Sequence, residues 1–92
     1  MEVFMRPSIA LCMIVKNEAK NLPKLFDSIE GCFDEIHITD TGSTDETVEI
    51  AKAYGAHVHT FEWVHDFAAA RNHSFQFPTT DYIMWMDGDD PQ

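Results

Sequence analysis

Two aspartates near the end of the sequence have the spacing of a metal-binding pair. Asp87 and Asp89 flank Gly88. In extended backbone this spacing puts both carboxylates on one face, with Cα atoms about 7 Å apart, so both can hold one ion. A hard cation such as Mg2+ or Mn2+ prefers oxygen ligands, often one or two carboxylates together with substrate phosphates. The alternative is a solvent-exposed acidic turn, because an Asp-x-Asp pair alone is a weak signal.

Asp40 is a second candidate, because it ends a β-branched segment and is followed by a turn at Gly42. A carboxylate in this position either accepts a hydrogen bond from a ribose hydroxyl or a base N–H, or caps the turn into the next helix. We expect Ser43 to be a helix cap rather than a ligand, because Glu46, three residues later, completes a capping box.

Three further polar residues stand beside apolar segments. Asn17 and Glu18 follow an apolar run and either line a base pocket or form an ordinary polar turn. Arg71 follows three alanines, and such small residues allow close helix packing that would aim its guanidinium at a site. Its fixed fork of donors suits a phosphate or a carboxylate. The alternative is a salt bridge to one of the many acids in this chain.

The segments that must position these residues alternate between strand and helix. The run from 9 to 15 is apolar throughout, which is typical of a strand buried on both faces of a parallel sheet. We predict strands over 9–15, 35–40, 56–61 and 82–86, and helices between Asn21 and Gly31, between Ser43 and Gly55, and over 66–77. This order predicts a Rossmann-like α/β fold, with a mostly parallel sheet and helices on both faces.

Such a fold would bring the candidate residues together. In an open parallel sheet, ligands bind beyond the carboxyl ends of the strands. The candidates Asn17, Glu18, Asp40, Asp87 and Asp89 end or follow three different predicted strands. We therefore expect them at one edge of the sheet, and that shared position is a stronger signal than any one of them.

Size and charge narrow the possible functions. The chain has 92 residues, which we expect to form a single domain over 1–92 with residues 1–7 flexible. With 16 acids and 6 bases the net charge is -10, so nucleic acid and anionic membranes are poor partners. The two cysteines make no disulfide framework, and no apolar run near the N-terminus is long enough to span a bilayer. We expect a reduced, cytoplasmic protein.

Four segments together resemble the family 2 glycosyltransferases and follow the order found in that family. They are residues 8–18, 40–47, 66–72 and 86–90. The resemblance implies the A-type glycosyltransferase fold, a nucleotide-sugar donor such as a UDP-sugar, a divalent metal and inversion at the anomeric carbon. By position, it implies that the nucleotide is bound by Asn17, Glu18, Asp40, Arg71 and Asp87, and the metal by Asp89 with Asp87.

The same resemblance limits the activity that we expect from this chain. Members of this family continue well past the Asp-x-Asp motif, and the later part carries the acceptor pocket and the general base. No residue of this chain matches that base, so we expect no catalytic residue here and no activity from this donor-binding part alone. We also expect the open flank of the sheet to favour self-association into a homo-oligomer.

Two other functions stay open. One is a nucleotidyltransferase with a related sheet, which should show a Gly-rich phosphate loop after the first strand, where this chain has Lys16, Asn17 and Glu18. The other is a non-catalytic module that binds a nucleotide or a metal, or that docks a partner.

Overall fold

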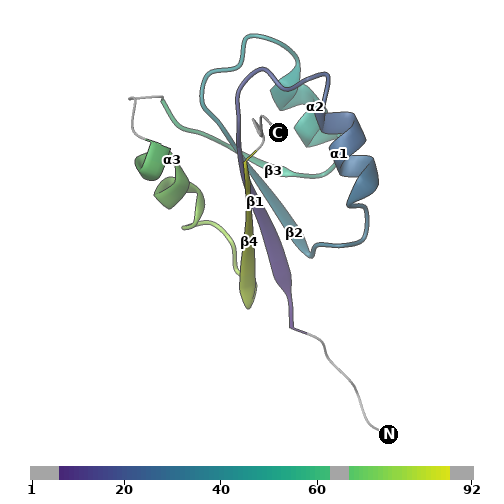
Figure 1. Cartoon of the computed structure of the whole chain (residues 1–92), viewed down its shortest axis with the longest axis vertical. Coiled ribbons are helices and arrows are strands. Elements are labelled where there is room, and N and C mark those ends of the chain that lie inside the picture. The colour runs from purple at the N-terminus through teal and green to yellow at the C-terminus, as the bar shows by residue number, and fades with distance from the viewer. Residues whose placement is uncertain (1–6, 63–66, 88–92) are drawn as a thin grey trace, which may run out of the picture.

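The computed structural model, which describes residues 7–62 and 67–87, contains a four-stranded parallel sheet with helices on both faces. The elements are β1 (Ile9–Val15), α1 (Leu22–Ser28), β2 (Glu35–Asp40), α2 (Thr47–Ala53), β3 (His57–Thr60), α3 (Phe67–Ser74) and β4 (Tyr82–Asp87). The strand order is β3-β2-β1-β4. Helices α1 and α2 cover one face and α3 lies on the other (Figure 1). The predicted fold class is thus confirmed. The expectation of a flexible start falls mostly on residues 1–6, which lie outside the described residues.

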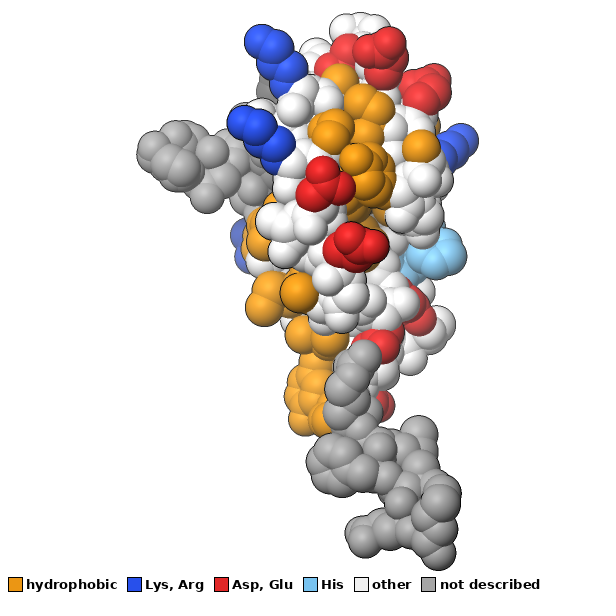
Figure 2. Space-filling view, turned by 90° about the vertical axis from the view of Figure 1, so that its right-hand side faces the viewer, with side chains coloured by type: hydrophobic (Ala, Val, Ile, Leu, Met, Phe, Trp, Pro, Cys, Tyr) orange, Lys and Arg blue, Asp and Glu red, His pale blue; other side chains and the backbone are white. Residues whose placement is uncertain are grey.

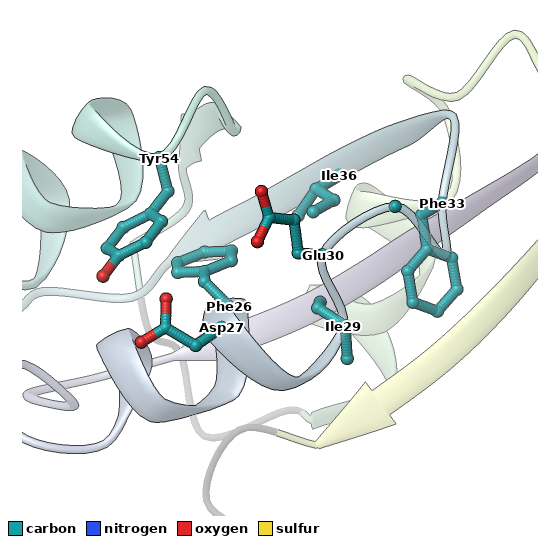
Figure 3. Close-up of a pocket in the computed structure, with 8 residues that line it drawn as sticks. Phe26, Asp27, Ile29, Glu30, Phe33, Ile36 and Tyr54 are labelled. Carbon is teal, nitrogen blue, oxygen red and sulfur yellow. The ribbon is translucent and has the colours of Figure 1, made fainter.

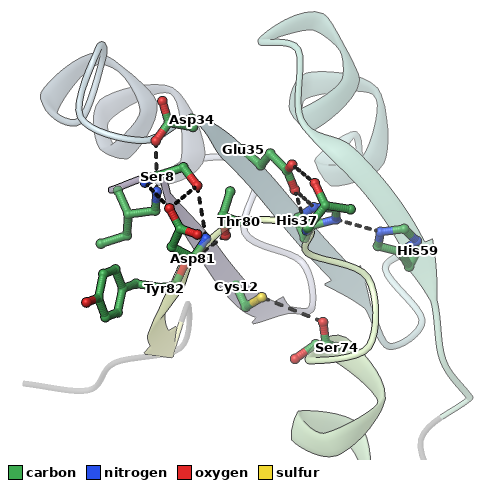
Figure 4. Close-up of polar contacts among 12 residues, drawn as sticks. Ser8, Cys12, Asp34, Glu35, His37, His59, Ser74, Thr80, Asp81 and Tyr82 are labelled. Carbon is green, nitrogen blue, oxygen red and sulfur yellow. Dashed lines mark hydrogen bonds and ion pairs between the residues drawn. The ribbon is translucent and has the colours of Figure 1, made fainter. Parts of the chain in front are cut away.

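The apolar run in the first strand is explained by its central position. Strand β1 pairs with β2 on one side and with β4 on the other, and all but its first residue are buried. Leu11, Met13 and Val15 belong to the core that Leu22 and Phe26 of α1 complete. On the opposite face, the Cys12 thiol donates to the carbonyl oxygen of Ser74 at the end of α3, at 3.6 Å (Figure 4). Both faces of this strand are therefore covered.

Hydrogen bonds at the amino ends of the strands fix their register. Asp81 accepts from the backbone N–H of Ser8 at 3.0 Å, while the backbone N–H of Asp81 donates to the Ser8 hydroxyl at 2.9 Å. On the other side of β1, Asp34 accepts from the N–H of Ile9 at 2.8 Å (Figure 4). A register shift by one residue would turn every side chain to the opposite face, so these contacts also set what reaches the carboxyl edge.

The predicted helix cap at Ser43 is wrong, because α2 begins only at Thr47. Asn21 does stand at the N-cap position of α1, although its side chain makes no cap hydrogen bond. The Ser43 hydroxyl donates to Asp40 instead, and the backbone N–H of Thr47 is bound by Asp45 at 2.9 Å. The side chain of Asp45, two residues before α2, thus binds a backbone N–H group at the start of the helix, a role that the sequence had predicted for Ser43.

The predicted helix ends are partly right. Gly55 follows α2 with φ of +89°, a left-handed conformation that favours glycine, as predicted for a helix stop. Helix α3 ends at Ser74, three residues before the predicted end at residue 77. The predicted cap at Asp66 lies outside the described residues. No helix in the described ranges is long and apolar enough to cross a membrane.

Candidate functional site

The strand register brings two candidate aspartates to the same edge. Asp40 is the last residue of β2 and pairs with Val15, while Asp87 is the last residue of β4 and pairs with Ile14. One strand separates them, which corresponds to a distance of about 10 Å between backbones. Their predicted co-location at the carboxyl edge of the sheet is confirmed at the level of the backbone. Asp89 lies outside the described residues.

The carboxylate of Asp40 is buried and held by three hydrogen bonds. Only 5% of the residue is exposed. Its Oδ2 accepts from the backbone N–H groups of Gly42 at 3.2 Å and Ser43 at 3.1 Å. Its Oδ1 accepts from the Ser43 hydroxyl. Both oxygens are therefore fixed in the turn after β2, and the left-handed φ of +120° at Gly42 is what lets the backbone N–H groups turn inward.

Asn17 joins the loop after β1 to the loop after β2. Its backbone N–H donates to Ser43 Oγ at 2.8 Å, and its side-chain Oδ1 accepts from the backbone N–H of Thr44 at 2.7 Å. Asn17 has φ of +55°, a left-handed conformation that asparagine tolerates better than most residues. The side-chain oxygen of Asn17 is thus already engaged within the protein, although the residue itself is exposed.

Glu18 is part of the same connection between the two loops. It is 7% exposed, its N–H donates to the Thr47 hydroxyl at 2.8 Å, and its Oε1 accepts from the Asn21 amide at 2.9 Å. A further bond joins the N–H of Ala19 to Asp45 Oδ2 at 3.2 Å. Several contacts of the Asp45 carboxylate lower its pKa, the largest being the hydrogen bond from the Thr47 side chain. The two loops are therefore tied together before any ligand arrives.

Arg71 lies on α3, on the face of the sheet opposite α1 and α2. Its guanidinium carbon is 5.6 Å from the centroid of the Trp85 ring, and Trp85 stands two residues before the end of β4. Arginine stacks well on aromatic faces in this way. The contact places the guanidinium beside the Trp85 ring of β4.

The described residues alone do not make a metal centre. Within 7–62 and 67–87, no group of three His, Cys, Asp or Glu residues is arranged to hold an ion. A metal at this edge would rest on the Asp-x-Asp motif, of which the structure places Asp87 at the end of a strand. A site of this kind takes few protein ligands and leaves the other positions to phosphate and water.

A histidine cluster on the α3 face was not predicted as a unit. His37 Nδ1 and His59 Nε2 are 3.0 Å apart, and His37 Nε2 lies 2.8 Å from Glu35 (Figure 4). Phe77 stacks on His59 with ring centroids 3.6 Å apart. The alternation in 57–60 puts His57 and His59 on one face, but only the pairing of β2 with β3 adds His37. His37 and His59 thus stack on Phe77, in the segment that follows α3.

A cavity lined by residues of α1, β2 and the loops beside them lies at the other end of the molecule. Its volume is about 260 Å³, and Phe26, Asp27, Glu30 and Tyr54 are among the residues around it (Figure 3). Apolar side chains bordered by acidic ones are also visible on the α1 side in Figure 2. Helices α1 and α2 start at the carboxyl edge of the sheet, so their ends mark the amino edge. The cavity is therefore not part of the candidate site.

The sequence pattern of the family described as glycosyl transferase family 2 matches residues 10–90. The chain belongs to this family. Among curated relatives, it is 42% identical over 82 residues to a TPR repeat-containing protein of Synechococcus elongatus, and 35% identical over 85 residues to the prophage-derived glycosyltransferase SunS of Bacillus subtilis. These matches cover 89% and 90% of this chain, but only 20% of each relative.

The fold is shared with solved structures of glucosyl-3-phosphoglycerate synthase from Mycobacterium tuberculosis. One of these, in complex with Mn2+, UDP and glucosyl-3-phosphoglycerate, superimposes with a TM-score of 0.73 at 25% identity. It is matched over 89% of this chain and 33% of the synthase chain. Another structure of the same synthase holds Mn2+, UDP-glucose and phosphoglyceric acid. The A-type glycosyltransferase fold predicted from the motifs is confirmed.

Proposed function

We propose that this chain is the donor-binding part of a glycosyltransferase that takes a sugar from a nucleotide-sugar donor, with a UDP-sugar as the expected donor. The observation that carries the proposal is the buried Asp40 carboxylate at the same sheet edge as Asp87. A buried, ordered carboxylate at a strand end is suited to accept a hydrogen bond from a nucleotide. Family membership and the UDP bound to the synthase of similar fold support the same conclusion.

We propose further that Asp87 and Asp89 hold a divalent metal on the diphosphate of the donor. The net charge of -10 makes an unaccompanied diphosphate a poor ligand, so a cation is needed to neutralise it. Mn2+ or Mg2+ would act as a Lewis acid and stabilise the leaving diphosphate. The Mn2+ and Mg2+ present in structures of the synthase support this choice of metal. Arg71 would lie beside the nucleotide on the α3 side.

Inversion at the anomeric carbon requires a general base within reach of the acceptor hydroxyl. The resemblance assigns no such base to this chain, and we propose that the acceptor side corresponds to the part of the relatives that this chain does not cover. The chain spans about a fifth of the length of the curated relatives named above. Transfer of the sugar is therefore proposed for the longer protein, with a cytoplasmic location, and binding of the donor for this part.

A thermal-shift series tests the proposal on the 92-residue chain. UDP with Mn2+ should raise the melting temperature, because a ligand that binds only the folded state stabilises it. The series compares UDP, GDP and no nucleotide, each with and without Mn2+. No shift with any nucleotide in the presence of Mn2+ would exclude the donor site in this chain. Asp89→Ala should remove the metal-dependent part of the shift, and a wild-type response from this variant would exclude the metal assignment.

A non-catalytic module that binds a nucleotide is the alternative to a donor site. The hydrogen bonds between the loops after β1 and β2 are compatible with both functions. The two candidates differ in the response to a sugar. A glycosyltransferase donor site should bind UDP-glucose or another UDP-sugar at least as well as UDP, whereas a nucleotide sensor has no reason to accommodate the sugar. Competition of a panel of UDP-sugars against UDP therefore separates them.

A further inference from the structure

We propose that Ser43 is a positioning residue that leaves Asp40 one free acceptor site, so that this carboxylate favours a base presenting a single N–H donor over one presenting two. The inference rests on the proposed function, because it assigns Asp40 to the base of the bound nucleotide. It starts from the hydrogen bonds that Asp40 already makes within the protein.

The direction of the Ser43 hydroxyl is fixed by its second partner. The backbone N–H of Asn17 donates to Ser43 Oγ at 2.8 Å and so occupies a lone pair of that oxygen. The hydroxyl has one hydrogen, and the carboxylate oxygen Oδ1 of Asp40 has none to give, so the hydroxyl must donate to Asp40. Asn17 thus holds Ser43 in the orientation in which it restrains Asp40.

The remaining acceptor capacity of Asp40 follows from these contacts. An ionised carboxylate has about four acceptor sites, two on each oxygen. Oδ2 already accepts from the N–H groups of Gly42 and Ser43, at 3.2 and 3.1 Å. Oδ1 accepts from the Ser43 hydroxyl, which leaves one site on Oδ1. Three bonds from three different donor atoms also prevent the carboxylate from turning to offer both oxygens outward.

A carboxylate restrained in this way distinguishes between bases. Uracil presents one N–H donor on its pairing edge, and this donor matches the one free site. Guanine presents two neighbouring donors, which suit a carboxylate that offers both oxygens. With Oδ2 occupied, the second guanine donor would be buried without a partner, which lowers affinity about tenfold. Cytosine presents an acceptor at the equivalent ring nitrogen and would face the carboxylate without a hydrogen bond there.

Calorimetric titration of the 92-residue chain with UDP, GDP and CDP in the presence of Mn2+ tests the inference. The wild type should bind UDP about tenfold more tightly than GDP. Ser43→Ala frees the second site on Oδ1 and removes one of the three bonds that restrain Asp40, so the UDP-to-GDP affinity ratio should fall toward one. Ser43→Thr keeps the hydroxyl and should keep the ratio. Ser43→Cys, whose thiol is a weak donor, gives an intermediate ratio and replaces the alanine variant if that one does not fold.

Asp45→Ala is the matched control for a merely structural effect. Asp45 also ties the two loops together, through Ala19 and Thr47, but it does not contact Asp40. This variant should weaken UDP and GDP alike and leave their ratio unchanged. An unchanged ratio in Ser43→Ala, or equal affinities for all three nucleotides in the wild type, would overturn the role of Ser43 while leaving the donor site in place. Absence of binding to every nucleotide would overturn the proposed function itself.

Discussion

Asp40 and Asp87 end two parallel strands at the same edge of the sheet, with only β1 between them. Their strands are separated by more than 40 residues of sequence, and the pairing of both with β1 is what makes them neighbours. A nucleotide that contacts Asp40 through its base would extend its phosphates along the edge toward Asp87. The proposed donor site therefore runs along this edge from the end of β2, across β1, to the end of β4.

Asp40→Asn should weaken nucleotide binding about tenfold to a hundredfold. The amide group offers one acceptor oxygen in place of two and adds two donors, which conflict with the N–H groups of Gly42 and Ser43. Hydrogen bonds to charged groups contribute about 1.5–3 kcal/mol each, which corresponds to this range. Calorimetric titration with UDP measures it. Asp27→Asn, at an exposed acid beside the distant cavity, should bind UDP like the wild type.

Substitution of Thr39 and of Thr47 compares the effects of two buried hydroxyl groups on stability. Both are fully buried, but the Thr39 hydroxyl has no hydrogen-bond partner among the described residues, whereas the Thr47 hydroxyl accepts from Glu18 and donates to Asp45. An unsatisfied buried hydroxyl lowers stability by about 1–3 kcal/mol. Thr39→Val should therefore raise the free energy of unfolding in urea by about 1 kcal/mol, and Thr47→Val should lower it by about 1–3 kcal/mol. Equal effects of the two substitutions would contradict this assignment of partners.

Acid should destabilise the contact between α3 and the sheet. Burial lowers the pKa of His59, and the neighbouring charges of His37, His57 and His73 lower it further. Above its ordinary pKa of about 6.5, His59 is neutral in both states and its packing contributes fully. As the pH falls below that value, the unfolded chain takes up the proton more readily, so stability decreases. His59→Phe should flatten the pH dependence of the melting temperature below about pH 6.5.

Glu35 affects the stability of the fold at a lower pH than His59 does. Hydrogen bonds from Thr79 and then His37 lower the pKa of Glu35 to about 2. Its contribution to stability is present above its ordinary pKa of about 4.3 and is lost as the pH falls toward 2. Glu35→Gln should remove this lower step and leave in place the step at higher pH that His59 causes. A melting profile in which the two variants change the same step would show that the two groups titrate as one unit.

The two cysteines should differ sharply in reactivity. Cys12 is buried, and burial raises its pKa to about 11, with a smaller effect from Glu35. Cys32 is exposed. Because the thiolate is the reactive form, iodoacetamide at pH 8 should label Cys32 rapidly and Cys12 only when the chain opens. The second labelling rate, followed by mass spectrometry, should fall when UDP and Mn2+ are added. Labelling of both residues at one rate would contradict the buried position of β1.

The outer edge of β4 should promote self-association of the 92-residue chain. Within the described residues β4 has a single neighbour, and its Tyr82, Ile83 and Met84 are 60%, 42% and 45% exposed. An exposed apolar edge strand favours pairing with a second copy, and a lysine on the edge opposes it. Light scattering at high concentration should detect association, which Ile83→Lys reduces. A monomeric mass for the wild type would contradict this prediction.

The sequence predicted the strands of this fold better than the hydrogen bonds at the carboxyl edge of the sheet. The apolar run from 9 to 15 and the alternation from 35 to 40 identify β1 and β2 with their observed bounds. These signals are local, because burial on one or two faces dictates the residue pattern within one strand. The shared edge of Asp40 and Asp87 also followed, since all parallel strands end on the same side.

The contacts at Ser43 and Asn17 could not be predicted in the same way. The Ser43–Glu46 spacing indicates a capping box, but the hydroxyl is taken by Asp40 and by a backbone group 26 residues away in sequence. The resemblance assigns Asn17 to the nucleotide but does not reveal that its side-chain oxygen accepts from the N–H of Thr44. A local motif does not reveal competition from a distant loop, because that depends on which strands are adjacent.

The central position of β1 also affects how the chain folds. Its partner β4 is joined to it through contacts between Ser8 and Asp81, which are 73 residues apart in sequence. Closing so long a loop is entropically expensive, and chains dominated by distant pairings fold slowly. Until β4 arrives, one hydrogen-bonding side of the most apolar strand is open to other chains. Among the described strands, β1 is synthesised before its partner β4, so its open side is exposed to aggregation until β4 has been made.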